Sequence, residues 1–96
     1  VQFCRDYRAS IKTIHLKDID PAVQARGQAD WGYGKYSDEG IWTELGRGAV
    51  DFPAIFQILR EDNFSGWLIV ETDVTQLPSA LESAQVSREY LRSQGL

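Results

Sequence analysis

His15 and Glu71 each stand at the end of a short apolar run, residues 11–16 and residues 67–71. Both runs are typical of buried strands in a parallel sheet. Ligands of parallel α/β proteins bind beyond the carboxyl ends of the strands, so a histidine and a carboxylate at two such ends are expected to face one pocket. An imidazole nitrogen and a carboxylate oxygen together suit a divalent metal ion. The alternative for His15 is a structural histidine that hydrogen-bonds to the backbone.

Further ionisable groups stand next to these strand ends. Lys17 shares the side-chain direction of His15 if the strand continues that far, and Asp18 begins the loop. Gathering such groups in one place is costly unless a ligand uses them. Glu71 follows four apolar residues, so it would tend to keep its proton unless a metal or a cationic group keeps it ionised. An ion pair with Lys17 or Arg47 is the alternative for Glu71.

The long segment between the two strands holds weaker signals. Gly46-Arg47-Gly48 lies just before a predicted helix, where glycines let the backbone approach a ligand and the helix N-terminus favours an anion. The alternative is a tight turn. Four aromatic residues either pack this segment down or wall a sugar-sized pocket, and packing is expected for most of them: Trp31, Tyr33, Tyr36 and Trp42. Asp73 is expected to be solvated or to cap a turn.

The elements that position these residues alternate between helix and strand. We expect a helix over residues 1–7, a strand over 11–16, and a long glycine-rich loop over about 17–50 with a helical turn or two at 21–28. Asp51 and Pro53 begin a helix over 51–62, whose apolar stripe packs on the sheet. After the strand at 67–71, a helix over about 78–92 carries apolar residues at helical spacing, namely Leu77, Leu81, Ala84 and Leu91. This order predicts a parallel β–α–β unit, and its two strands need neighbours.

Composition narrows the function classes. The net charge of −4 and the scattered lysines and arginines argue against nucleic-acid binding. No apolar run approaches the length that spans a membrane. A single cysteine and no signal peptide favour a cytoplasmic setting. The chain starts at Val1 and contains no methionine, so we expect it to be the C-terminal fragment of a longer protein.

Several strings of this sequence resemble the sugar phosphate isomerase/epimerase family, the xylose isomerase-like group of TIM barrels. They are IHLKD at 14–18, LGRGAVDF at 45–52, GWLIVE at 66–71 and the stretch 82–91. Inosose dehydratase-like members look most similar. The resemblance implies an α/β fold in which residues 1–96 form the C-terminal part of one (β/α)8 barrel domain. Residues 11–16 and 67–71 would then be strands seven and eight.

The resemblance also implies site residues and chemistry. Family members hold one divalent metal (Mn²⁺, Co²⁺, Mg²⁺ or Zn²⁺) through two glutamates, an aspartate and a histidine, and His15 and Glu71 match two of these four ligands. Glu71 would double as the general base, while Lys17, Asp18 and Arg47 would bind the substrate. The implied reaction is proton abstraction next to a carbonyl of a sugar, sugar phosphate or inosose, giving an isomer, an epimer or a dehydrated product.

Two other functions compete with this enzyme. A non-catalytic piece that only closes a barrel or mediates assembly is favoured if His15 and Glu71 point apart or pair with Lys17 and Arg47. A DNA-repair endonuclease of the same superfamily would need extra metal ligands and a basic surface. The expected partners are therefore a small sugar or polyol substrate and the remaining barrel strands of the parent chain, in a monomer or a homo-oligomer.

Overall fold

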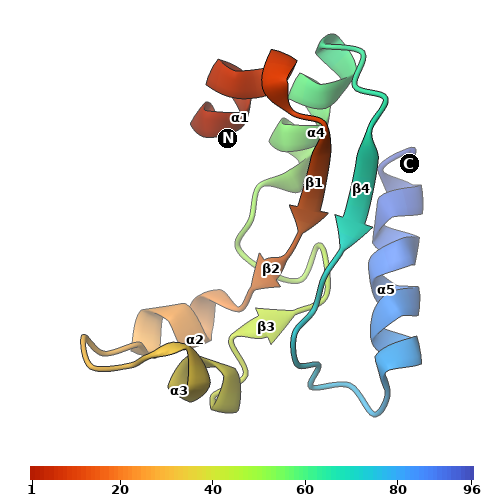
Figure 1. The fold of residues 1–96 in the computed structure, drawn as a ribbon. Helices are drawn as coiled ribbons and strands as arrows, with labels where there is room; N and C mark the ends of the chain where they lie inside the picture. Colours follow the sequence, from red (N-terminus) through yellow and green to blue (C-terminus); the bar gives the residue numbers. More distant parts are fainter.

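A computed structural model describes all residues, 1–96, as a mixed α/β chain. Two strands, β1 (Thr13–Leu16) and β4 (Trp67–Val70), run parallel, with His15 beside Ile69 and Leu16 beside Val70. Helix α4 (Phe52–Glu61) lies between them in sequence, so the predicted parallel β–α–β unit is confirmed. Figure 1 shows the strands side by side, with both arrowheads pointing toward the part of the molecule that holds residues 17–50.

Helix α4 begins where its sequence predicts. The Asp51 side chain accepts a hydrogen bond from the Ala54 amide at 3.1 Å, and Pro53 occupies the first turn, where its missing N–H costs nothing. The predicted apolar stripe of this helix faces the sheet. The core contains the following residues: Leu16, Leu45, Phe52, Phe56, Leu59 and Leu91. Helix α4 therefore supplies half of the buried cluster that supports β1 and β4.

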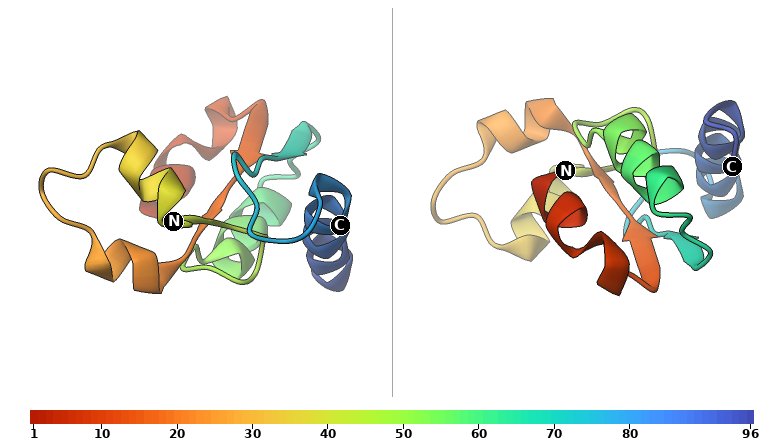
Figure 2. Two further views of the ribbon diagram at one scale, coloured as in Figure 1. Left: turned by 90° about the horizontal axis from the view of Figure 1, so that it is seen from below. Right: turned by 90° about the horizontal axis from the view of Figure 1, so that it is seen from above.

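The β1–β4 pair is covered on one face only. Both views in Figure 2 place α4 and α5 (Ala80–Ser93) on the same side of the strands. On the opposite face His15 is exposed, and Trp67 and Ile69 are 78% and 40% exposed. Within these 96 residues the two predicted buried strands are therefore covered on one face and open on the other. The reason is that no second layer packs against the open face.

The segment after β1 is more structured than the predicted loop. It contains β2 (Asp18–Ile19), α2 (Pro21–Arg26), α3 (Tyr33–Asp38) and β3 (Trp42–Thr43), and β2 pairs antiparallel with β3. The helical turn expected at 21–28 is confirmed as α2, which Asp20 caps by accepting from Ala22 and Val23. This small lobe adjoins the carboxyl ends of β1 and β4 (Figure 1).

Helix α5 contacts the core through Leu91 of the predicted apolar repeat and through two serines outside that repeat. Its buried residues are Ser83, Ser87 and Leu91, whereas Leu81 is 68% exposed. The small serines allow close packing, since the Ser87 hydroxyl accepts a hydrogen bond from the Leu45 amide at 3.2 Å. The apolar repeat is thus confirmed at Leu91, whereas Leu81 and Ala84 are exposed because serines meet the turn at 44–46.

The remaining elements lie at the amino-terminal end. Helix α1 (Gln2–Tyr7) and a short 3₁₀ turn (Arg8–Ser10) precede β1, which confirms the helix predicted over residues 1–7. The one cysteine, Cys4, is free and half-buried. No helix of the chain has the length and apolar character needed to cross a membrane.

Candidate functional site

The register of β1 and β4 brings His15 and Glu71 together. The strands pair up to Leu16 and Val70, and the Glu71 amide continues the ladder by donating to the Leu16 carbonyl at 2.9 Å. Because side chains alternate along a strand, His15 and Glu71 both extend on the open face of the sheet. Their placement at adjacent carboxyl ends follows directly from the two apolar runs.

Both oxygens of Glu71 have a partner. His15 Nδ1 lies 2.5 Å from Glu71 Oε2, and Lys17 Nζ lies 2.8 Å from Glu71 Oε1. These contacts, Lys17 first and His15 second, lower the pKa of Glu71 below its ordinary value. The ion pair with Lys17 that the sequence left open is therefore present together with the predicted contact to His15. Glu71 stays ionised although it follows an apolar strand.

Lys17 also forms an ion pair with Asp73, which the sequence predicted to be solvated or to cap a turn. Its ammonium lies 2.7 Å from Asp73 Oδ1, and the Tyr33 hydroxyl donates to Asp73 Oδ2 at 2.7 Å. Asp73 first and Glu71 second raise the pKa of Lys17. The Lys17 ammonium also sits 4.7 Å from the centre of the Trp42 ring. The only available signal for Asp73 was its spacing of two residues from Glu71.

Asp18 serves the scaffold and not the open site. It is fully buried, and its two oxygens accept from four backbone amides, those of Ile19, Gly46, Gly48 and Val50, at 3.0–3.1 Å. Each oxygen already accepts two hydrogen bonds inside the protein, and neither is exposed, so none is free for a substrate. The expectation that Asp18 binds substrate is thereby corrected, because strand alternation turns it inward where Lys17 turns outward.

Arg47 lies in the exposed turn between Gly46 and Gly48, and its side chain forms no hydrogen bond or ion pair, although its backbone amide donates to the Glu44 carbonyl at 3.1 Å. The turn itself is explained by its glycines. Gly46 has a φ of +82°, and a Cβ on Gly48 would stand 2.2 Å from Asp18 Oδ1. The hydrogen bonds from Gly46 and Gly48 to Asp18 thus hold the turn, and the Arg47 side chain extends from it on the surface. It does not join the contacts around Glu71.

The pair His15–Glu71 fits the donor chemistry of a divalent metal, with one imidazole nitrogen and one carboxylate at contact distance. The chain does not bring together three histidine, cysteine or acidic side chains in a metal-binding group. The described residues therefore contain two adjacent donor groups and no complete metal-binding group.

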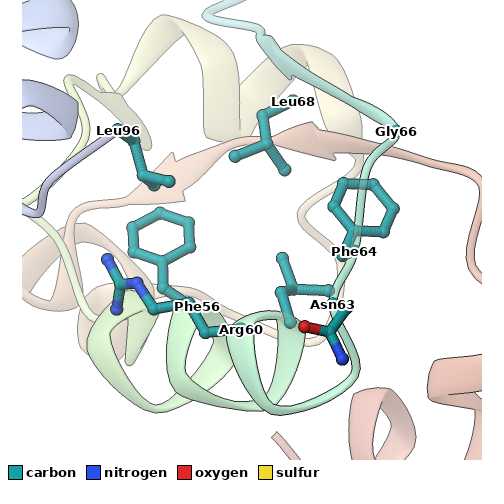
Figure 3. A pocket seen from close by; sticks show the side chains of 8 residues that line it. Phe56, Arg60, Asn63, Phe64, Gly66, Leu68 and Leu96 are labelled. Atoms are coloured by element: carbon teal, nitrogen blue, oxygen red, sulfur yellow. The ribbon is translucent and has the colours of Figure 1, made fainter.

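An apolar cavity of the chain lies away from this site. About 470 Å³ in volume, it is lined mainly by apolar side chains of α4 and of the start of β4, together with Leu96 (Figure 3). Gly66 and Leu68 place it at the amino-terminal end of β4, whereas Glu71 follows the carboxyl end. The His15–Glu71 pair and this apolar cavity therefore lie at opposite ends of β4.

Comparison with known proteins shows the family of this chain. The chain is similar to inosose dehydratases, with 34% identity over 94 residues to that of Clostridium botulinum, 36% over 90 residues to that of Clostridium tetani and 30% over 90 residues to that of Klebsiella pneumoniae. These matches cover 96%, 92% and 92% of this chain but only 32%, 30% and 30% of the relatives. The chain thus spans about a third of their length. The profile of the xylose isomerase-like TIM barrel family matches residues 2–94, and the chain belongs to that family.

Proposed function

We propose that this chain forms the last two strands, seven and eight, of the barrel of a metal-dependent enzyme that dehydrates an inosose or a related cyclic sugar. The observation that carries the proposal is the meeting of His15 Nδ1 and Glu71 Oε2 at 2.5 Å, at the carboxyl ends of two adjacent parallel strands. This is the end of such a sheet where ligands bind. Similarity to inosose dehydratases favours dehydration over isomerisation or epimerisation, which use the same first step.

His15 and Glu71 would hold one divalent ion, Mn²⁺, Co²⁺, Mg²⁺ or Zn²⁺, with the further ligands coming from barrel strands outside these 96 residues. A bound ion would supply positive charge that polarises the substrate carbonyl and stabilises negative charge on its oxygen. The open face of β1 and β4, with its exposed Trp67 and Ile69, is where the other barrel strands and their side chains would pack.

Glu71 acts as the general base in this proposal. Its carboxylate lies at the carboxyl end of β4 between Lys17 and His15, where it can take a proton from the carbon next to the carbonyl. In dehydration, the electron pair left on that carbon forms a double bond as hydroxide leaves the neighbouring carbon, and the hydroxide combines with the proton taken by Glu71 to leave as one water. Return of the proton to the other face of the same carbon would give an epimer instead.

Lys17 and Arg47 have different parts in substrate binding. Lys17 is held beside Glu71 and can donate a hydrogen bond to a substrate hydroxyl or carbonyl oxygen. Arg47 is unpaired on the turn before α4 and is available to an oxygen or a phosphate group farther from the reacting carbon.

The test uses the full-length protein with an inosose, and mass spectrometry to follow the loss of one water. We expect activity to disappear on treatment with a chelator and to return with a divalent metal. Glu71→Gln should lower kcat by about 10²–10⁴-fold, the range for loss of a general base. His15→Ala should weaken metal binding at least about tenfold. The matched control is Glu82→Gln, which changes an exposed glutamate on α5. Full activity in the chelated protein, or equal rates for the two glutamine variants, would overturn the proposal.

A further inference from the structure

The structure separates the four aromatic residues of the segment 17–50 into two pairs. Trp31 and Tyr36 meet edge to face with ring centres 5.2 Å apart, and Lys35 covers Trp31. This pair packs the small lobe, as the sequence led us to expect for most of the four. Tyr33 and Trp42 form the other pair, with ring centres 5.8 Å apart. The second pair has contacts that the first lacks.

Tyr33 and Trp42 are both connected to the ionised cluster at the strand ends. The Tyr33 hydroxyl donates to Asp73, whose other oxygen binds Lys17. The Trp42 ring lies beneath the same ammonium, and its indole N–H donates to the buried Ser37 hydroxyl at 2.9 Å, which fixes the ring. Lys17, which contacts the Trp42 ring, also binds Glu71, so a single side chain connects the aromatic pair to Glu71.

The Tyr33 hydroxyl is hydrogen-bonded, whereas most of the residue is exposed to solvent. The residue is 63% exposed, although its hydroxyl has a carboxylate partner and its ring a neighbouring indole. Tyr33 and Trp42 also line a shallow cavity of about 280 Å³, near the lower limit for small-molecule pockets. A large aromatic ring that is fixed in place and open to solvent beside charged groups is suited to contact a ligand.

We infer that Tyr33 contacts the ring face of a cyclic substrate, and that Asp73 and Trp42 hold it in position for this. The inference rests on the proposed function and adds a residue that determines specificity. A cyclic polyol carries hydroxyls on its rim and C–H groups on its faces. Its rim matches Lys17 and Asp73, and its weakly positive C–H face matches the negative face of an aromatic ring. An open-chain polyol has no such face and loses more conformational freedom on binding.

The experiment measures binding to the full-length protein by calorimetry, with the cyclic hexol inositol and the open-chain hexitol sorbitol as probes. We expect the protein to bind inositol more tightly than sorbitol. Tyr33→Ala removes the ring and should weaken inositol binding about tenfold, the effect of losing one well-placed aromatic contact, with little change for sorbitol. Tyr33→Phe keeps the ring, loses the bond to Asp73 and should weaken inositol binding about threefold to fivefold.

Controls separate specificity from folding. Tyr7→Ala and Tyr7→Phe make the same changes at an exposed tyrosine of α1 that also packs on one aromatic neighbour, Phe3, and they should leave both affinities unchanged. If Tyr33→Ala fails to fold, Tyr33→Phe still tests the contact, because it changes a single exposed hydroxyl. A protein that binds the two polyols equally, or a Tyr33→Ala variant that keeps the preference for inositol, overturns the inference.

Failure of the role of Tyr33 and failure of the proposed dehydration give different results. Dehydration of an inosose together with an unchanged ring preference in Tyr33→Ala defeats the role of Tyr33 alone. A ring preference that depends on Tyr33, in a protein that releases no water from an inosose, defeats the proposed reaction and supports Tyr33 as a binding residue.

Discussion

Replacing Asp18 by asparagine should destabilise the protein far more than a change of one atom suggests. Oδ1 of this buried carboxylate accepts from the amides of Ile19 and Val50, at 3.0 and 3.1 Å. Oδ2 accepts from the amides of Gly46 and Gly48, also at 3.0 and 3.1 Å. The four donors are thus divided equally between the two oxygens. In Asp18→Asn one oxygen becomes an NH₂ group, which is a donor and cannot accept.

The size of the effect follows from this division. Whichever way the Asn amide is turned, two backbone N–H groups face a donor and lose their acceptor. A buried donor without a partner costs about 1–3 kcal/mol, so two of them cost about 2–6 kcal/mol, and relaxation of the turn should leave about 3 kcal/mol. The two remaining hydrogen bonds also lose the strength that a charged acceptor gives.

The assay is urea denaturation of the full-length protein, in which a stability change appears as a shift of the midpoint. The matched control is Asp20→Asn at the start of α2. There a single oxygen accepts from Ala22 and Val23 at 2.7 and 3.2 Å, and asparagine caps a helix as well as aspartate does. We expect less than about 0.5 kcal/mol for the control. Equal losses for Asp18→Asn and Asp20→Asn would refute the assignment of Asp18 to the scaffold.

Two further substitutions examine the same interior. Gly48→Ala should lower the melting temperature, because its Cβ would stand 2.2 Å from Asp18 Oδ1, whereas Gly32→Ala, whose Cβ meets nothing within 4 Å, should leave it nearly unchanged. For Glu44, burial raises the pKa, but hydrogen bonds, that of the Thr75 hydroxyl foremost, outweigh burial and hold the pKa below the ordinary 4.5. The stabilisation by ionised Glu44 is therefore present above about pH 4.5 and lost as the pH falls through the folded-state pKa. Urea midpoints should fall less on acidification in Glu44→Gln than in the unchanged protein, and an identical pH dependence would contradict this.

The features that the sequence predicted correctly are those with local signals. Helix α4 is specified by an Asp51 cap, by Pro53 in the first turn and by apolar residues at helical spacing, all within one short stretch. The meeting of His15 and Glu71 needed only one non-local step, the parallel pairing of two strands joined by a helix. The site depends on where β1 ends, and that end was predicted correctly at Leu16. The error of two residues at the start of β1 therefore did not change the predicted position of His15.

The features that the sequence did not predict depend on contacts between distant residues. The bonds of Asp18 to the turn at 46–50 span about thirty residues, and the bond from Tyr33 to Asp73 spans forty. No periodicity records such pairs, because a buried aspartate and a loop aspartate look alike in sequence. The exposure of Leu81 has a different cause, because here a local signal was present but did not decide which side of α5 is buried. Helical spacing located a possible apolar face, but the close approach of the turn at 44–46 selected the serine face.

The alternation of side chains at the end of β1 explains how an exposed cluster can be held firmly. Leu16 and Asp18 turn inward, where Asp18 binds the turn that precedes α4. His15 and Lys17 turn outward, where Lys17 binds Glu71 and Asp73. Surface ion pairs alone contribute little to stability and tolerate many geometries. Here the backbone of Lys17 lies between two fixed neighbours, so its ammonium is placed by the buried contacts of Asp18. The order of side chains from the end of β1 to the start of β2 thus joins the scaffold to the site. Loss of the Asp18 hydrogen bonds should therefore displace the Lys17 ammonium more than the Glu71 carboxylate.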